Sequence, residues 1–286
     1  MSPLQPERRR TLRCGKQSLD LTAPLVMGVL NVTPDSFSDG GRYTDVKRAV
    51  EHALRMVEEG AAIIDIGGES TRPGAAPVSA AEEVDRVVPV IERLAGRTPA
   101  VISVDTSKPD VIRAAVAAGA GLVNDVRALS MEGALAAAAA TSCGVCLMHM
   151  QGEPLTMQRR PAYADVVKEV NEFLLARVQA CRAAGIADER IAIDPGFGFG
   201  KTQAHNLELL RRLPELARGG VPLLVGLSRK SLVADLTGRP ARERLSGSLA
   251  LAALAVLNGA CIVRAHDVAA TLDAVRVALA VRGEHD

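Results

Sequence analysis

The sequence has no tryptophan, and aromatic residues make up only 2% of its 286 residues. Proteins that hold single-stranded nucleic acid stack its bases on aromatic side chains, so this composition argues against that class. The charge is also balanced, with 34 basic and 33 acidic residues, which leaves no basic field for a polyanion. We therefore expect no nucleic-acid partner.

Long apolar runs are missing as well. The longest, residues 248–256, is too short to cross a bilayer and lies within a helical pattern. The charged residues 7–11 have no apolar segment behind them, as a secretory signal would require. These observations predict a cytoplasmic protein that makes no membrane contact.

The five cysteines are an odd number, which argues against a framework of disulfide bonds. Cys143 and Cys146 have the C-x-x-C spacing of redox and zinc motifs. A redox pair opens a helix, whereas this pair opens an apolar run that is typical of a strand. The sequence has no second pair to complete a zinc site. We expect two packed thiols.

The chain does contain a regular alternation of short aliphatic runs and longer segments with a period near 3.6 residues. The runs predict eight strands, at residues 25–30, 61–65, 100–105, 121–125, 145–148, 191–194, 222–226 and 261–264. The longer segments predict eight helices, at residues 45–59, 79–94, 109–118, 132–140, 163–184, 203–218, 242–257 and 268–281.

Strands that are apolar throughout are buried on both faces, as in a parallel sheet. Eight strand–helix units over about 250 residues have the size of a closed (β/α)8 barrel, the TIM barrel. An open doubly wound sheet is the alternative, but no G-x-G-x-x-G follows the first strand. We predict an α/β protein in which residues 23–286 form one barrel domain, preceded by an extension, residues 1–22, that can form a hairpin.

Polar residues stand at every predicted strand end. In a barrel of this type these ends share one mouth, so the set predicts a binding site rather than eight unrelated turns. The first strand leads into a loop, residues 31–41, that is almost free of aliphatic side chains, as functional loops often are. The strand-end residues are Asn31, Asp65, Asp105, Asn124, His149, Asp194, Ser228, Lys230, Arg264 and His266.

The mouth divides by chemistry into two sectors. Asp105, Asn124 and Asp194 can accept from and donate to a flat heterocycle with an amidine-like edge, because a carboxylate pairs with adjacent N–H donors. The last two strand ends carry hydroxyls and cations where this fold usually binds phosphate. Asn31, with Asp35 or Asp39, can hold a hard cation such as Mg²⁺ that bridges phosphate oxygens.

Several residues have a second reading. Asp65 can contact the ligand or only tie the following loop, and His149 is better explained as a hydrogen-bonded core histidine. Lys230 could form a Schiff base, with Arg229 helping to lower its pKa. Residues 196–202 end like a P-loop, but the required first glycine is replaced by Pro195, so we reject a nucleotide site.

Eight motifs together resemble the dihydropteroate synthase family, the sulfonamide target of folate biosynthesis. The resemblance runs from about Met27 to the end of the chain, and no motif position departs from the family pattern. The motifs are residues 31–41, 65–74, 103–106, 124–125, 148–152, 193–201, 228–231 and 264–267.

The resemblance implies a Mg²⁺-dependent transferase that joins 6-hydroxymethyl-7,8-dihydropterin pyrophosphate to p-aminobenzoate, and that is typically a homodimer. By position, the pterin would contact Asp105, Asn124, Met148, Asp194, Phe199, Gly226, Lys230 and Arg264, with Arg264 stacked on it. The pyrophosphate would contact Asn31, Arg264 and His266, and Asn31 would also hold the metal. The p-aminobenzoate pocket would be formed by Phe37, Thr71, Arg72, Pro73, Ser228 and Lys230. Catalysis would depend on Asn31, Asp105, Lys230, Arg264 and His266.

Two other functions remain open on the sequence. The related barrels that bind methyltetrahydrofolate for corrinoid methyl transfer would share the pterin contacts but not need the phosphate cluster. A non-catalytic paralogue would keep the barrel without turnover. Release of pyrophosphate discriminates both from the transferase.

Overall fold

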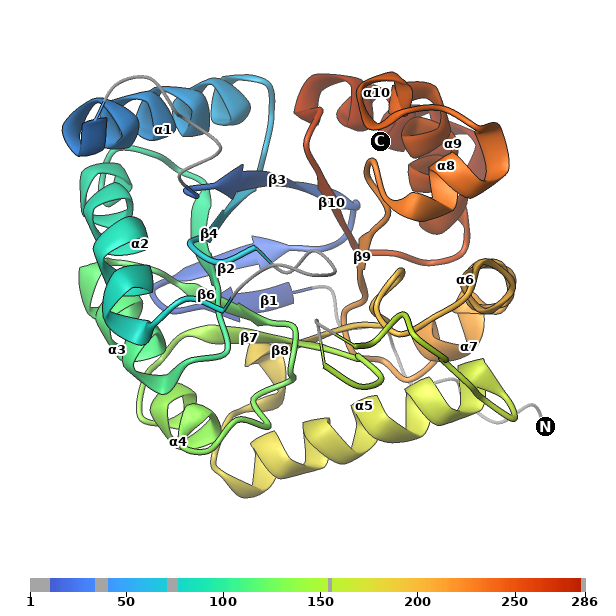
Figure 1. The fold of residues 1–286 in the computed structure, drawn as a ribbon, viewed down its shortest axis with the longest axis horizontal. Coiled ribbons are helices and arrows are strands. Elements are labelled where there is room, and N and C mark those ends of the chain that lie inside the picture. The colour runs from blue at the N-terminus through green and yellow to red at the C-terminus, as the bar shows by residue number, and fades with distance from the viewer. Residues whose placement is uncertain (1–10, 34–40, 71–76, 154–155, 284–286) are drawn as a thin grey trace.

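The computed structural model describes residues 11–33, 41–70, 77–153 and 156–283. Parallel strands stand around a common axis, and helices surround them (Figure 1). The strands of this sheet are β3 (Leu25–Asn31), β4 (Ile63–Gly67), β5 (Val101–Asp105), β6 (Leu122–Asp125), β7 (Gly144–Met148), β8 (Ile191–Asp194), β9 (Leu224–Gly226) and β10 (Ile262–Ala265).

The sheet follows the order β8-β7-β6-β5-β4-β3-β10-β9, and the neighbouring strands in this order are all parallel. A single parallel bridge between Ile193 and Leu223 joins β8 to the start of β9 and brings the two ends of the sheet together. The ring is therefore a (β/α)8 barrel, and the predicted fold class is confirmed.

The helices occur where the periodicity predicts them, with two differences. The helix expected at residues 203–218 is interrupted at Arg212, because Pro214 has no N–H with which to continue it. The short helix α8 was not predicted. The helices are α1 (Gly41–Glu58), α2 (Ala80–Leu94), α3 (Pro109–Ala118), α4 (Ala134–Ala139), α5 (Val166–Ala183), α6 (Gln203–Arg211), α7 (Leu213–Ala217), α8 (Ser231–Thr237), α9 (Leu245–Leu257) and α10 (Val268–Arg282), with 3-10 turns at Asp188–Arg190 and Ala241–Glu243.

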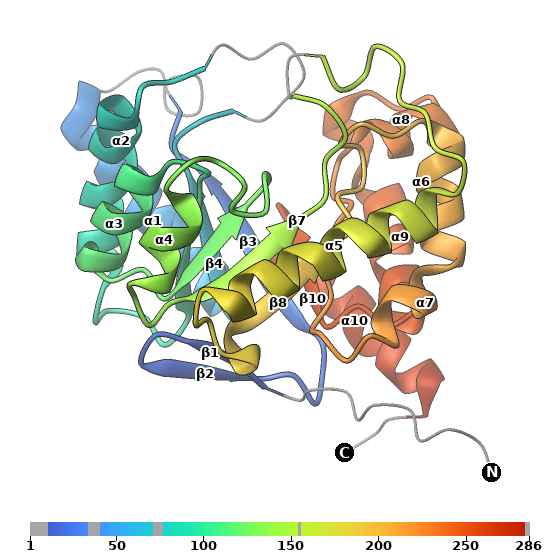
Figure 2. The ribbon, with the colours of Figure 1, turned by 90° about the horizontal axis from the view of Figure 1, so that it is seen from below.

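The expected hairpin is present as β1 (Thr11–Cys14) and β2 (Gln17–Asp20), which pair antiparallel below the barrel (Figure 2). Leu12 and Leu19 are buried in one cluster with the barrel residues Met27 and Ile63. Since the hairpin covers the N-terminal ends of the strands, the open mouth of the barrel is at their C-terminal ends.

Cys143 and Cys146 are free and buried, Cys146 within β7 and Cys143 just before it. Burial raises the pKa of both thiols above the ordinary value, which disfavours the reactive thiolate. The two cysteines are packed side chains, as expected. Within the described part of the chain, no helix has the length and apolarity that crossing a bilayer requires.

Candidate active site

The strand register aligns polar residues from neighbouring strands in one layer of the mouth. Asn31 pairs with Gly67, Gly67 with Asp105, and Asp105 with Asn124. Because Gly67 has no side chain, the space between Asn31 and Asp105 stays open: a Cβ there would lie 3.8 Å from Asp105 Oδ2 and 3.9 Å from Asn31 Oδ1.

Four of the predicted residues lie outside the described part of the chain. They are Phe37, Thr71, Arg72 and Pro73, which the resemblance assigns to the p-aminobenzoate pocket; Asp35 and Asp39, offered as metal ligands, also lie outside it. All the other predicted site residues are described.

Asp65 is the centre of a buried network. Its carboxylate accepts hydrogen bonds from Ser103 Oγ at 2.7 Å, Asn124 Nδ2 at 2.9 Å and Arg264 Nε at 2.6 Å. Its side chain is fully buried and lies mid-strand, two residues before the end of β4. The sequence had left open whether Asp65 touches a ligand or ties the following loop. In the structure it instead orients Asn124 and Arg264 from below.

Arg264 joins this network to the mouth. Its Nη2 donates to Asp105 Oδ2 at 2.9 Å, so one guanidinium lies between two carboxylates. Burial disfavours the charged form of Arg264, but Asp65 and Asp105 outweigh it and raise the pKa of the guanidinium. Burial raises the pKa of Asp105 to about 7, although Arg264 opposes this shift. Asp105 is therefore poised for a ligand that offers N–H donors or positive charge.

A second charged pair stands across the mouth. Asp194 is buried at the end of β8, and burial raises the pKa of its carboxyl against the opposing charge of Lys230. Burial lowers the pKa of Lys230 to about 8, while Asp194 holds it up. Lys230 Nζ donates to Phe197 O at 2.6 Å and lies 4.7 Å from the centre of the Phe199 ring.

Small and apolar residues separate these charges. A Cβ on Gly226 would lie 3.7 Å from both Arg264 Cβ and Lys230 Nζ, so the glycine leaves room between the two cations. Met148 is buried at the end of β7, directly beside Asp194. The structure thus brings the described members of the predicted pterin set around one mouth.

The phosphate sector is built by β9 and β10. Ser228 Oγ is 3.1 Å from His266 Nδ1 and accepts from the His266 backbone N–H at 3.3 Å. Arg229 has φ of +57° and donates two hydrogen bonds to the carboxylate of Asp267. Its charge is therefore not directed at Lys230: after burial, the cation that lowers the pKa of Lys230 is Arg264. The expectation that Arg229 does this was wrong.

His149 is a core histidine, as expected. Its side chain is 6% exposed and packs edge-on against the Phe173 ring at 5.0 Å. Lys201 Nζ lies 2.9 Å from Nδ1. Burial, assisted by the Lys201 charge, lowers the pKa of His149 to about 3, so the ring is neutral near pH 7.

The sequence did not single out Ser103, Lys201 or Gln158 as functional. Ser103 is polar in the middle of an aliphatic strand, and this signal could have indicated a partner inside the barrel. Lys201 follows three alternating glycines; it stands in the rejected P-loop match and at the end of the motif 193–201, but was given no role of its own. The backbone N–H of Gly196 in fact donates to Asp194 Oδ1 at 2.7 Å, so this loop closes on a carboxylate rather than on a phosphate.

A closed barrel with buried carboxylates and cations at its C-terminal mouth defines an α/β-barrel enzyme acting on a small polar molecule. The pterin-binding enzyme family model matches residues 27–266. A dihydropteroate synthase of Escherichia coli is 56% identical over 260 residues, covering 91% of this chain and 92% of that protein.

Solved structures agree. A Yersinia pestis dihydropteroate synthase in complex with a sulfonamide drug superimposes with a TM-score of 0.91 at 53% identity, covering 96% of this chain and 99% of that one. A Xanthomonas albilineans dihydropteroate synthase with 4-aminobenzoic acid gives 0.90 at 54% identity, covering 96% and 98%. The chain belongs to the dihydropteroate synthase family, whose members are transferases.

Proposed function

We propose that this chain condenses 6-hydroxymethyl-7,8-dihydropterin pyrophosphate with p-aminobenzoate, giving 7,8-dihydropteroate and pyrophosphate. The observation that carries the proposal is the charge distribution of the mouth in a chain of this family. The largely buried carboxylates that end β5 and β8 lie next to cations, Arg264 on β10 and Lys230 after β9. Such a mouth can hold a cationic heterocycle on one side and an anionic leaving group on the other.

The chemistry is a substitution at the pterin methylene carbon. The bond from this carbon to the pyrophosphate oxygen breaks, and the oxygen leaves with the electron pair. The p-aminobenzoate nitrogen then forms the new C–N bond and loses one proton. An aniline nitrogen is already neutral near pH 7, so the step needs no strong general base. We propose that bond breaking runs ahead of bond making, which places positive charge on the pterin.

The protein's part is electrostatic. Asp105 and Asp194 would stabilise the pterin cation, with Asn124 held by Asp65 to hydrogen-bond the ring edge. Arg264 would give up its hydrogen bond to Asp105, so that this carboxylate can bind the pterin ring, and its guanidinium would stack on the face of that ring. Met148, Phe199 and Gly226 would line the pocket, with Lys230 at its edge.

Mg²⁺ fits this mouth if most of its ligands come from the phosphate oxygens of the substrate and few from the protein. Among the described residues, no group of three or more His, Cys, Asp or Glu side chains could hold an ion. Asn31 offers one amide oxygen beside the open space at Gly67, and Mg²⁺ commonly takes few protein ligands plus phosphate oxygens. When bound, the metal would neutralise charge on the leaving pyrophosphate. Arg264 and His266 would bind the pyrophosphate oxygens that the metal does not contact.

We place p-aminobenzoate against Ser228 and Lys230, between the phosphate sector and the pterin. Phe37, Thr71, Arg72 and Pro73 complete this pocket in the proposal. The Yersinia pestis relative was solved as a sulfonamide drug complex, which supports sulfonamides as competitors of p-aminobenzoate in this chain.

A steady-state assay of pyrophosphate release tests the proposal. We expect release that requires the pterin pyrophosphate, p-aminobenzoate and Mg²⁺ together, and that a sulfonamide inhibits competitively with p-aminobenzoate. A corrinoid-linked methyl transferase or a non-catalytic paralogue would release none. The absence of pyrophosphate release would therefore contradict the proposed function.

We further propose a homodimer in the cytoplasm. The five cysteines are free and buried, which fits a reducing compartment. Helices α9 and α10 pack side by side (Figure 1), and both carry apolar side chains that are exposed to solvent. Val277 is 63% exposed and Val281 73%, with Leu254 at 46%. A second copy of the chain, seated on this face, would cover them.

A further inference from the structure

Residues 196–200, here called the glycine loop, have a side-chain donor on every backbone carbonyl. The loop follows β8 and alternates glycine with phenylalanine; its three glycines have φ of +68°, +82° and +62°. Such a backbone leaves its carbonyls outside any helix or sheet; among them, Gly196 O also accepts from the Phe199 backbone N–H at 3.1 Å. The side-chain donors, in chain order from the Gly196 to the Gly200 carbonyl, are Lys201, Lys230, Gln158, Lys201 and Tyr163.

Lys201 supplies two of these five bonds from a position inside the protein. Its side chain is 3% exposed, and its Nζ lies 2.9 Å from Gly196 O and 3.0 Å from Phe199 O. The third close partner is His149 Nδ1 at 2.9 Å. An ammonium has three N–H donors and here meets three acceptors within 3.0 Å, with His149 O farther away at 3.5 Å, a match that favours its charged form. Burial works in the opposite direction and lowers the pKa of Lys201 to about 7.

The loop in turn fixes the proposed pterin pocket. Phe197 O accepts from Lys230 Nζ at 2.6 Å, and the Phe199 ring lies beside the same ammonium. The Gly196 N–H holds Asp194 Oδ1 at 2.7 Å. A displacement of the loop would therefore move an aromatic wall, a cation and a carboxylate of the mouth together.

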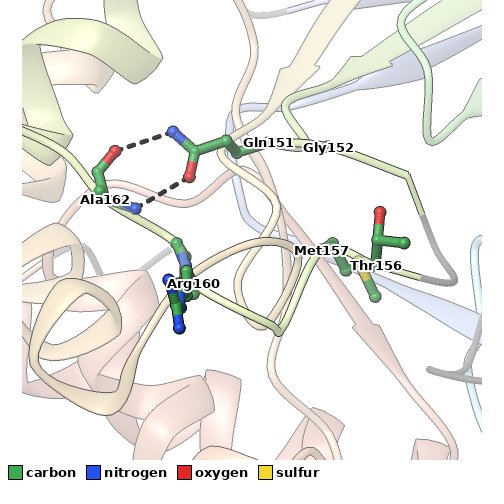
Figure 3. A pocket seen from close by; sticks show the side chains of 7 residues that line it. Gln151, Gly152, Thr156, Met157, Arg160 and Ala162 are labelled. Carbon is green, nitrogen blue, oxygen red and sulfur yellow. Dashed lines mark hydrogen bonds between the residues drawn. The ribbon is translucent and has the colours of Figure 1, made fainter.

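The outer side of the loop is supported by the segment after β7. Tyr163 OH donates to Gly200 O at 2.8 Å. The Gln151 amide makes two hydrogen bonds to the Ala162 backbone, at 2.8 and 3.0 Å (Figure 3). A surface cavity of about 350 Å³ lies there, lined by Gln151, Gly152, Thr156, Met157, Arg160, Pro161 and Ala162. None of these lining residues is a predicted strand-end residue. We therefore assign the cavity to the segment that supports the glycine loop and not to the substrate site.

We infer that Lys201 is a positioning residue for the pterin pocket, which it holds in shape through the Gly196 and Phe199 carbonyls without touching substrate. The inference rests on the proposed function. It assigns a role to a buried cation that the substitution chemistry does not use.

The test compares Lys201→Met with Lys168→Met, which replaces a lysine in a solvent-exposed α5 pair. Methionine keeps the apolar stem and removes all three donors. We expect Lys201→Met to raise the KM for the pterin pyrophosphate by roughly tenfold or more, since bonds to a charged donor are lost. The KM for p-aminobenzoate should change less than about twofold, and Lys168→Met should behave as wild type. In ¹⁵N spectra of histidine, the His149 Nδ1 signal should lose its hydrogen-bond shift.

An unchanged pterin KM in folded Lys201→Met, or equal losses for both substrates, would overturn the inference. If Lys201→Met does not fold, Lys201→Gln replaces it, because the glutamine amide removes the charge but keeps two N–H donors in place of three. It should raise the pterin KM in the same direction by a smaller factor, and an unchanged value would again overturn the inference. If the wild-type enzyme releases no pyrophosphate, the proposed function fails, whereas a working wild type with an unaffected variant rejects only the role of Lys201.

Discussion

The carboxylate of Asp65 lies where no solvent reaches, yet it is saturated by donors from three different strands. A buried anion of this kind is tolerated because both of its oxygens accept hydrogen bonds and a cation neutralises it, and it gives direction to those partners. Arg264 and Asn124 are oriented by Asp65 before any ligand arrives. The residue therefore acts on the mouth from one layer below it.

Replacing Asp65 with Asn removes the charge that neutralises Arg264 and leaves an amide N–H facing donors. We expect the free energy of unfolding to fall by about 3 kcal/mol, as when one partner of a buried pair is lost. Affinity for the pterin pyrophosphate should fall as well. Urea unfolding and calorimetry measure the two effects.

Asp110→Asn is the matched control, because Asp110 pairs with Arg113 in solvent. Its cost should stay below about 0.5 kcal/mol. Equal costs for the two variants would show that the Asp65 network does not contribute what we assign to it.

His149 predicts an acid sensitivity. The pKa of its ring is about 3 in the folded protein, against an ordinary value of 6.5. Between these values the unfolded chain binds the proton and the folded chain does not, so stability is full above pH 6.5 and is lost as the pH falls toward 3. The slope from this group is at most about 1.4 kcal/mol per pH unit.

His149→Gln should remove that slope in urea unfolding measured from pH 7 to 4. His205→Gln serves as the control, since His205 caps the start of α6 and glutamine can take the same capping role. A wild-type pH slope that survives in His149→Gln would contradict the assignment.

At the scale of elements, the glycine loop passes so close to the end of β7 that this contact decides which residues it can contain. Gly196 and Gly185 both have positive φ, at +68° and +86°. A Cβ on Gly196 would collide with the His149 carbonyl oxygen, whereas one on Gly185 would meet nothing within 4 Å. The first glycine is required by contact and conformation, and the second by conformation alone.

Gly185→Ala should therefore cost about 1 kcal/mol, from the left-handed backbone. Gly196→Ala should cost at least about 2 kcal/mol more, because the loop must move away from β7. The difference in thermal unfolding midpoints measures this. Equal midpoints would mean that the loop yields freely, which would also weaken its role in the pocket.

The periodicity of the sequence was sufficient for the strands, most helices and the position of the mouth, because each of these depends on local pattern. The break at Arg212 was missed because one proline interrupts an otherwise continuous pattern. The role of Asp65 and the contact of Lys201 with His149 could not be predicted, since these contacts join residues that are distant in sequence. Side chains near the mouth can be recognised by position, but their mutual orientation depends on the closed ring.

At the scale of the molecule, the hairpin closes one end of the barrel and the chemistry is confined to the other. Gly121 and Gly144 permit the hairpin to lie this close, because a Cβ on either would come within 2.8 Å of a hairpin carbonyl oxygen. The outer surface of the surrounding helices also differs in polarity from one side of the barrel to the other. The face of α9 and α10 exposes apolar side chains and is the surface we assign to a second copy.

Val277→Glu should shift the protein from dimer to monomer in sedimentation velocity, because a carboxylate would be buried at the contact. Leu175→Glu, at a 40% exposed position on α5, is the control and should leave the dimer intact. A wild-type monomer at micromolar concentration, or a Val277→Glu variant that remains dimeric, would contradict this surface.

We propose the strand-end mouth as a pterin pyrophosphate site, and calorimetric titration of that substrate into wild type and Asp105→Asn tests this assignment. Asp105 holds Arg264 at 2.9 Å, and its removal should cost a charge-assisted bond to the pterin. We predict one site per chain in the wild type and an affinity loss of about 10- to 100-fold in the variant. Equal affinity in the two proteins would contradict the account.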